Sequence, residues 1–108
     1  MKGKIVFITG ASSGIGEGCA RKFASQGSDL ILNARNVAKL EELKVELEAK
    51  YGVRICLLPF DVRDRNAATM ALASLPEEWK RIDVLVNNAG LVIGVDKNLR
   101  ETWTNGIL

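Results

Sequence analysis

Three glycines lie within residues 9–16, and their spacing is typical of a turn that binds phosphate. The segment reads Thr-Gly-Ala-Ser-Ser-Gly-Ile-Gly, so that Gly10, Gly14 and Gly16 form a G-x-x-x-G-x-G pattern. An apolar run precedes the turn and a helical pattern follows it. The first turn of a helix offers unpaired backbone N–H groups and a partial positive charge to an anion. A flexible turn is the alternative, but the strand before and the helix after favour a dinucleotide-binding turn.

Individual residues of this turn have different expected roles. Gly10 allows the tight turn, Gly14 lets the backbone approach a pyrophosphate, and Gly16 allows the helix to pack closely on the sheet. The hydroxyls of Ser12 and Ser13 can form neutral hydrogen bonds to phosphate. No Gly-Lys-Ser/Thr follows the turn, which argues against a kinase-type site where a lysine reaches a γ-phosphate.

The residue after the second apolar run, at residues 29–34, indicates which nucleotide would bind. In nicotinamide-binding proteins this run ends at the adenosine ribose, where an acidic residue usually accepts hydrogen bonds from the hydroxyls. Here Ala34 stands at that place and Arg35 follows it. A carboxylate would repel a 2′-phosphate, whereas a guanidinium can bind one through a forked contact, and Asn36 can add a neutral hydrogen bond. The pattern favours NADP over NAD; the alternative is a solvated loop arginine.

Asp61 and Val62 follow the third apolar run. A carboxylate at this place can accept a hydrogen bond from the adenine amino group, while the valine packs on the ring. The alternative for Asp61 is a turn or helix-capping residue, which is a common use of aspartate.

The fourth apolar run leads into Asn-Asn-Ala-Gly at residues 87–90. Asparagine side chains such as that of Asn88 can tie neighbouring strand ends together. The small residues Ala89 and Gly90 leave room for a ribose to pass close to the backbone. The segment alone could be a simple turn, but its position directly after a predicted strand favours a role in cofactor binding.

Four apolar runs alternate with three helical patterns along the chain. The strands are expected at residues 4–9, 29–34, 53–60 and 82–87, and the helices between them end near Gly27, Gly52 and Pro76. Strands that are apolar at consecutive positions are buried on both faces, and the alternation implies right-handed parallel crossovers. The prediction is an α/β fold: a doubly wound parallel sheet of four strands in the order 3-2-1-4. A cofactor would bind where the first and fourth strands end.

Composition excludes several classes of function. A length of 108 residues predicts one domain, and a net charge of +2 without runs of like charge predicts neither nucleic-acid nor membrane partners. No segment resembles a membrane span or a secretory signal. Histidine is absent, and Cys19 and Cys56 lack metal-ligand spacing, so no metal site is predicted. Both cysteines are expected as buried thiols in a reducing cytoplasm.

Taken together, the glycine turn, Asp61-Val62 and the Asn-Asn-Ala-Gly segment resemble the short-chain dehydrogenase/reductase family over about residues 3–94. Residues 61–65, 73–79 and 82–90 are similar to NADP-dependent 3-hydroxy acid (serine-type) dehydrogenases. The resemblance implies a Rossmann-type domain, NADP(H) as cofactor, and a homo-oligomer that reversibly oxidises a small hydroxy acid. The cofactor contacts that it implies, together with the residues of the same motifs, are Gly10, Ala11, Ser12, Ser13, Gly14, Ile15, Gly16, Arg35, Asn36, Asp61, Val62, Asn88, Ala89 and Gly90.

The catalytic residues of that family are missing from this sequence. The family uses a serine and a Tyr-x-x-x-Lys pair, in which the lysine lowers the pKa of the tyrosine toward working pH. The single tyrosine here is Tyr51, and position 55 is Ile55. We therefore expect no hydride transfer by this chain alone. Asn105 corresponds to an asparagine that supports the family's proton relay, and it is the one candidate for a catalytic role.

The domain prediction follows from these motifs. Residues 1–94 are expected to form an NADP-binding half-domain and residues 95–108 a truncated or rearranged tail, in which residues 103–108 resemble a family segment with its interior deleted. The chain is predicted to be the cofactor-binding half of an NADP-dependent dehydrogenase; the alternative is a non-catalytic NADP-binding fragment, natural or engineered. With four strands, the apolar run at residues 84–86 would form an open sheet edge that invites another chain.

Overall fold

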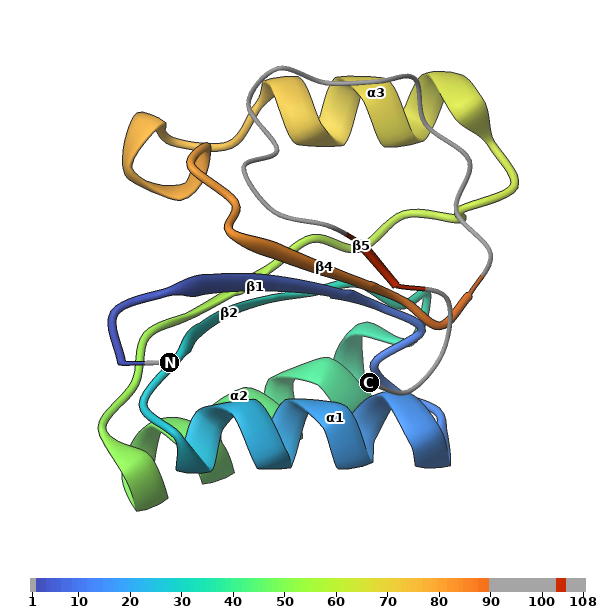
Figure 1. Cartoon of the computed structure of the whole chain (residues 1–108). Helices are drawn as coiled ribbons and strands as arrows, with labels where there is room; N and C mark the ends of the chain where they lie inside the picture. The colour runs from blue at the N-terminus through green and yellow to red at the C-terminus, as the bar shows by residue number, and fades with distance from the viewer. Residues whose placement is uncertain (1, 90–102, 105–108) are drawn as a thin grey trace.

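Strands and helices alternate along the chain, and the strands lie side by side in one sheet (Figure 1). The computed structural model describes residues 2–89 and 103–104. The elements are β1 (Ile5–Thr9), α1 (Gly14–Ser25), β2 (Asp29–Leu32), α2 (Val37–Tyr51), β3 (Ile55–Leu57), α3 (Arg65–Ala73), a 3-10 helix (Glu77–Trp79), β4 (Val84–Asn87) and β5 (Trp103–Thr104).

The sheet has the order β3-β2-β1-β4-β5, and all of its pairings are parallel. Ile8 of β1 lies opposite Leu32 of β2 on one side and Val86 of β4 on the other. The chain therefore winds outward from β1 to β3 and then crosses back to β4. This confirms the predicted 3-2-1-4 order, with the reversal between β1 and β4.

A short fifth strand lies beyond β4. Its pairings join Leu85 to Trp103 and Val86 to Thr104. The prediction of an open edge along β4 was wrong at these two positions. A two-residue strand has too few residues to show the apolar pattern by which a strand is recognised in a sequence.

Apolar side chains cover both faces of the sheet. Val6, Ile8 and Leu30 belong to a buried cluster that includes residues of α1 and α2, whereas Phe7 and Ile31 belong to a second cluster with residues of α3. Figure 1 shows α1 and α2 on one face and α3 on the other. Successive strand residues point to opposite faces, so a strand covered on both sides is apolar throughout.

Local signals explain where the helices begin and end. The side chains of Ser13, Asn36 and Asp64 each accept a backbone N–H from the first turn of α1, α2 and α3, respectively. Gly52 ends α2 in the left-handed conformation, at φ +69°. The predicted third strand, residues 53–60, proved too long. Leu58 still donates its N–H to the Leu32 carbonyl, but the next residue is a proline, which has no N–H for the ladder.

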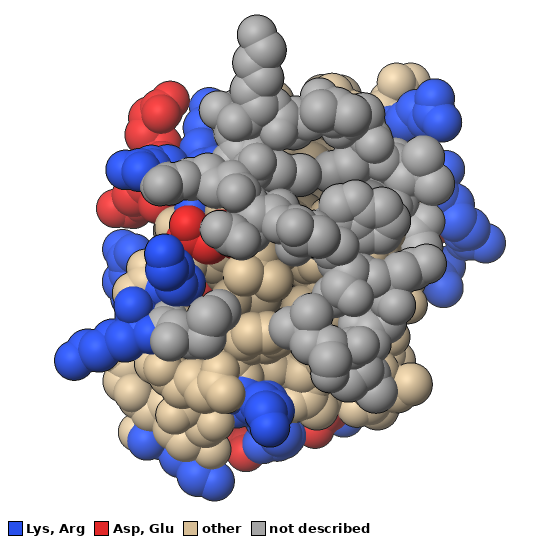
Figure 2. Space-filling model, viewed as in Figure 1, with Lys and Arg blue, Asp and Glu red and all other residues tan. Residues whose placement is uncertain are grey.

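The described surface carries charges of both signs. Figure 2 shows Lys and Arg side chains on both flanks of the face in view, with Asp and Glu beside them on one flank. None of the helices in the described part of the chain is both long and apolar enough to cross a membrane. Among residues 2–89 and 103–104, no group of three or more cysteine or acidic side chains is placed to hold a metal ion.

Candidate functional site

The glycine turn connects the end of β1 to the start of α1. Gly10 adopts φ +64°, a left-handed conformation that favours glycine. A Cβ atom at Gly10 would lie 2.9 Å from Nδ2 of Asn88, so the position is also closely packed. Ser13 closes the turn, because its N–H and its hydroxyl both donate to the Gly10 carbonyl, at 3.2 and 2.8 Å.

The other two glycines of the motif have very different surroundings. A Cβ at Gly16 would lie 2.0 Å from the carbonyl oxygen of Gly10, so Gly16 allows α1 to approach the turn itself. The sequence predicted that Gly16 lets the helix pack closely on the sheet, whereas the closest approach in the structure is to the glycine turn itself. A Cβ at Gly14 would meet no described atom within 4 Å. Internal packing accordingly gives no reason for a glycine at position 14, and the space beside it is open.

Hydrogen bonds tie the ends of β1 and β4 together. The hydroxyl of Thr9 donates to Oδ1 of Asn87 at 3.1 Å and accepts the N–H of Ala89 at 3.0 Å. Nδ2 of Asn88 donates to the Gly10 carbonyl at 3.2 Å and to Oγ of Ser13 at 2.8 Å. The Asn-Asn-Ala segment thus holds the glycine turn from the neighbouring strand, as the sequence predicted for these asparagines.

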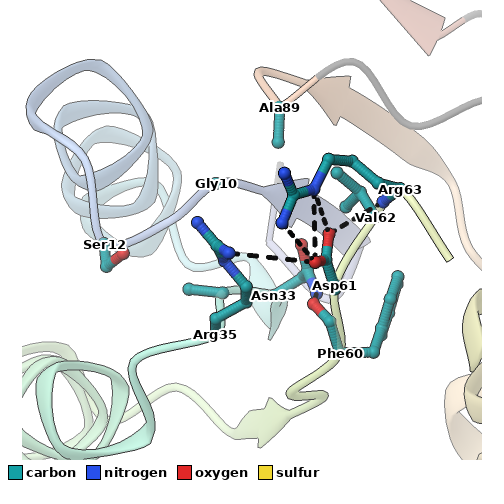
Figure 3. Close-up of a pocket in the computed structure, with 10 residues that line it drawn as sticks. Gly10, Ser12, Asn33, Arg35, Phe60, Asp61, Val62, Arg63 and Ala89 are labelled. Atoms are coloured by element: carbon teal, nitrogen blue, oxygen red, sulfur yellow. Dashed lines mark hydrogen bonds and ion pairs between the residues drawn. The ribbon is translucent and has the colours of Figure 1, made fainter.

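A cavity of about 320 Å³ opens at the carboxyl ends of the strands, next to this turn (Figure 3). This volume is within the usual range for a small-molecule site. Strand ends, and the loops that follow them, supply its walls. The lining residues are Gly10, Ser12, Asn33, Ala34, Arg35, Phe60, Asp61, Val62, Arg63 and Ala89.

The cavity brings together six of the residues that the sequence singled out: Gly10, Ser12, Arg35, Asp61, Val62 and Ala89. Its lining does not include Ala11, Ser13, Gly14, Ile15, Gly16, Asn36 or Asn88. Ala11 and Gly16 are buried in the turn, whereas Ser13, Gly14 and Ile15 are exposed at the start of α1. Gly90 and Asn105 lie outside the described residues.

Two predicted phosphate ligands also have structural roles. Asn36 caps α2, because its Oδ1 accepts the N–H of Lys39 at 3.1 Å. Oγ of Ser13 accepts the N–H of Gly16 at 3.4 Å in addition to the Asn88 amide. The backbone N–H groups of Gly14 and Ile15 lie in the first turn of α1. They have no earlier carbonyl of the helix to which they can donate a hydrogen bond.

Asp61 lies between two arginines at the cavity wall (Figure 3). Nη2 of Arg63 approaches Oδ2 of Asp61 to 2.8 Å, and Nε of Arg63 lies 3.0 Å from Oδ1. Nη1 of Arg35 is 3.8 Å from Oδ2 on the other side. Hydrogen bonds from the Arg63 side chain and backbone, followed by the charges of Arg63 and Arg35, hold the pKa of Asp61 well below its usual range. The carboxylate is ionised, and the three side chains carry a net charge of +1.

Four lining residues were not among the predicted cofactor contacts: Asn33, Ala34, Phe60 and Arg63. Asn33 is 1% exposed, and its Nδ2 donates to the carbonyls of Leu58 and Phe60, both at 3.0 Å. It therefore positions the segment that carries Asp61. A polar residue directly after a buried apolar run was the available signal for Asn33. For Arg63, the signal was a cation two residues after a candidate ligand.

Comparison with known proteins agrees with this arrangement. Residues 4–105 match the family described as short chain dehydrogenase. The chain is 47% identical over 98 residues to the NADP-dependent 3-hydroxy acid dehydrogenase of Schizosaccharomyces pombe, covering 90% of this chain and 38% of that protein.

Solved structures show the same likeness. The L-sorbose reductase of Gluconobacter frateurii, complexed with NADPH and L-sorbose, matches with a TM-score of 0.77 and 39% identity, over 83% of this chain and 34% of that one. The serine dehydrogenase of Escherichia coli matches with a TM-score of 0.72 and 48% identity, over 83% and 40%.

These matches extend over most of this chain but only part of each relative. The chain spans little more than a third of the length of the relatives described above. Within that span, the glycine turn, the 3-2-1-4 strand order and the cavity at the strand ends agree with the family match over residues 4–105. The chain belongs to the short-chain dehydrogenase family.

Proposed function

We propose that this chain binds NADP(H) across the carboxyl ends of β1, β2 and β4. The observation that carries the proposal is that Arg35 lines the same cavity as Gly10 and Ser12 of the glycine turn. The Arg35 side chain is 70% exposed, so its guanidinium can reach a 2′-phosphate with a forked contact.

The rest of the site fits the same nucleotide. The open space beside Gly14, at the N-terminus of α1, suits a pyrophosphate, because backbone N–H groups and the helix dipole favour an anion there. We assign the adenine to Asp61 and Val62, and the ribose next to the nicotinamide to Asn88, Ala89 and Gly90. NADP(H) as the nucleotide is supported by the NADP-dependent dehydrogenase of Schizosaccharomyces pombe and by the L-sorbose reductase that was solved with NADPH.

We further propose that the chain serves a dehydrogenase acting on the CH–OH group of a small hydroxy acid. NADP(H), when bound, accepts or supplies the hydride. The residues described here bind and orient the nucleotide. We do not assign the proton-transferring group to Tyr51, because this single tyrosine ends α2 and does not line the cavity.

A second function deserves the same test, because the 108 residues contain no Tyr-x-x-x-Lys pair. The chain would then hold NADP(H) without turnover. Both proposals expect NADP(H) binding without turnover by the purified chain alone, so they differ in another measurement: the sequence of the gene after the codon for Leu108. A reading frame that continues and encodes Tyr-x-x-x-Lys supports the dehydrogenase proposal, and a stop codon there supports the second.

Nucleotide binding is tested by calorimetric titration of the full chain with NADPH and with NADH. We expect NADPH to bind at least about tenfold more tightly, which corresponds to about 1.4 kcal/mol. Arg35→Ala should remove most of this preference. The matched control is Arg81→Ala, which changes an exposed arginine before the amino end of β4, away from the cavity. Equal affinity for both nucleotides in the unmodified chain would contradict the proposal.

Three finer proposals accompany the main one. We place the nucleotide-binding unit in residues 1–94, with residues 95–108 as a rearranged tail. A cytoplasmic location is supported by Cys19 and Cys56, which are free thiols. A homo-oligomer is our remaining proposal for the partner of this chain, and sedimentation analysis would test it.

A further inference from the structure

Arg63 has no assigned role, although it makes the closest contacts in the cavity wall. Its side chain is 75% exposed, yet the guanidinium forms three hydrogen bonds with the two carboxylate oxygens of Asp61, between 2.8 and 3.2 Å. The backbone N–H of Arg63 also donates to Oδ1 of Asp61 at 2.9 Å. This arrangement is a forked, charge-assisted pair, and its geometry is more specific than that of a typical surface ion pair.

Asp61 is an obstacle to a 2′-phosphate unless its charge is balanced. It is the only acidic residue among those described as lining the cavity. Its Oδ2 lies 3.8 Å from Nη1 of Arg35, the group that would bind the phosphate. An unbalanced carboxylate beside Arg35 would repel a phosphate bound there and would also compete with it for the guanidinium.

The geometry of Arg63 counters both effects. Figure 3 shows Arg63 and Arg35 reaching Asp61 from different sides. Because Arg63 provides the short contacts and Arg35 only a longer one, the carboxylate is neutralised mainly by Arg63. The Arg35 guanidinium is therefore available to bind another anion.

We propose that Arg63 is a positioning residue for nucleotide specificity, which acts by holding and neutralising the Asp61 carboxylate so that Arg35 can bind a 2′-phosphate. This inference rests on the proposed function, because it concerns the same nucleotide site. It adds a residue that acts through Asp61 and need not touch the nucleotide.

The test uses two probes that differ only by the 2′-phosphate: adenosine 2′,5′-bisphosphate and adenosine 5′-monophosphate. Their dissociation constants are measured by calorimetry on the full chain, and the ratio of the two is the readout. Arg63→Gln should lower the preference for the bisphosphate about tenfold, since it leaves the Asp61 charge beside Arg35. Arg65→Gln is the matched control, because Arg65 is an exposed arginine two residues further on that does not line the cavity.

Two more variants separate an action through Asp61 from direct contact with the phosphate. Asp61→Asn alone should raise the preference for the bisphosphate, because the competing charge is gone. In the double variant Arg63→Gln/Asp61→Asn the preference should return to that of the unmodified chain or above it. A merely structural role of Arg63 predicts no such recovery, because the second substitution restores no contact.

The outcomes are distinct. If the unmodified chain binds neither probe nor NADPH, the proposed function fails. If it prefers the bisphosphate and Arg63→Gln keeps the same ratio, the role of Arg63 is overturned while the proposed function stands. If Arg63→Gln loses the preference and the double variant does not regain it, Arg63 either contacts the phosphate directly or has a merely structural role, and its action through Asp61 is overturned.

Discussion

Nδ2 of Asn88 lies 2.8 Å from Oγ of Ser13, so a residue just after β4 holds the N-cap of α1 from across the strand reversal. The same Nδ2 donates to the Gly10 carbonyl at 3.2 Å. Two segments 75 residues apart in the chain are thus fixed to each other at the glycine turn. The shape of the proposed phosphate site depends on both segments.

Asn88→Ala should weaken nucleotide binding and lower stability together. Loss of the two hydrogen bonds should cost about 1 kcal/mol of unfolding free energy. The turn would also lose its support, so we expect NADPH affinity to fall about tenfold. Urea unfolding and calorimetric titration measure the two effects. Asn66→Ala, on the exposed side of α3, should change neither by a comparable amount.

Gly16→Ala should be strongly destabilising. The added Cβ would lie 2.0 Å from the Gly10 carbonyl oxygen, a backbone atom that cannot move without the turn. We expect a loss of about 2 kcal/mol or more in unfolding free energy. Gly18→Ala, two residues further along the same helix, meets nothing within 4 Å and should instead add about 0.5–1 kcal/mol. A tolerated Gly16→Ala would show that the turn is looser than described.

Gly14→Ala should weaken nucleotide binding without lowering the stability of the fold. The new methyl group meets no described atom within 4 Å, so the melting temperature should be unchanged or slightly higher. The methyl group would nevertheless occupy the space that we assign to the pyrophosphate. We expect a loss of NADPH affinity of about tenfold or more. Full retention of affinity would place the pyrophosphate elsewhere.

The ion pair of Asp61 predicts an acid-dependent component of stability. The folded-state pKa of Asp61 is lowered by its hydrogen bonds to Arg63 and by the nearby arginine charges. The unfolded chain therefore binds a proton on Asp61 more readily than the folded chain does. The resulting stability is present above about pH 4, the ordinary carboxyl value, and is lost as the pH falls through the lower folded-state value.

Urea unfolding of the unmodified chain and of Asp61→Asn, from pH 6 down to the lowest pH at which the chain folds, checks this expectation. The difference in unfolding free energy between the two should shrink as the pH falls below about 4. A difference that does not change with pH would mean that the carboxylate makes no stabilising pair in solution. Added salt should reduce the difference at pH 6, because the pair is partly exposed.

Both cysteines should react slowly with thiol reagents in the folded chain. Cys19 is buried as predicted, whereas Cys56 is only partly buried. Removal from water raises the pKa of both thiols, and the thiolate is the reactive form. At pH 8 we expect slow modification by Ellman's reagent in buffer and complete reaction of two thiols in denaturant. Fast reaction of either cysteine in buffer would contradict the raised thiol pKa values.

The sequence alone predicted much of this fold because its strands and helix ends have strong local signals. Runs such as Leu30 to Leu32 are apolar at consecutive positions, which is expected of a strand covered on both faces. Asp64 and Gly52 marked a helix start and a helix end through chemistry that depends on few neighbours. Strand β5 was not predicted because two residues are too few to show the apolar pattern of a strand.

The site was predicted less completely than the fold. Gly10, Arg35 and Asp61 lie where the sequence placed them, since the ends of parallel strands meet at one edge of a sheet. Asn33 was not predicted as a site residue because the carbonyls that accept its hydrogen bonds, those of Leu58 and Phe60, are brought close only by folding. Arg63 lies two residues from its partner Asp61, so a local signal existed, but the spacing alone does not show that the two side chains pair.

The lining residues of the cavity come from four separate parts of the chain: Gly10 and Ser12, residues 33–35, residues 60–63, and Ala89. A ligand that binds all four at once can bind only when the whole sheet is assembled. Its binding free energy is therefore added to the global unfolding equilibrium, about 2.7 kcal/mol at a ligand concentration of 100 times Kd. Amide hydrogen exchange should then slow throughout β1, β2 and β4, far beyond the atoms that touch the ligand. In this molecule, occupancy of the site would report on the integrity of the sheet as a whole.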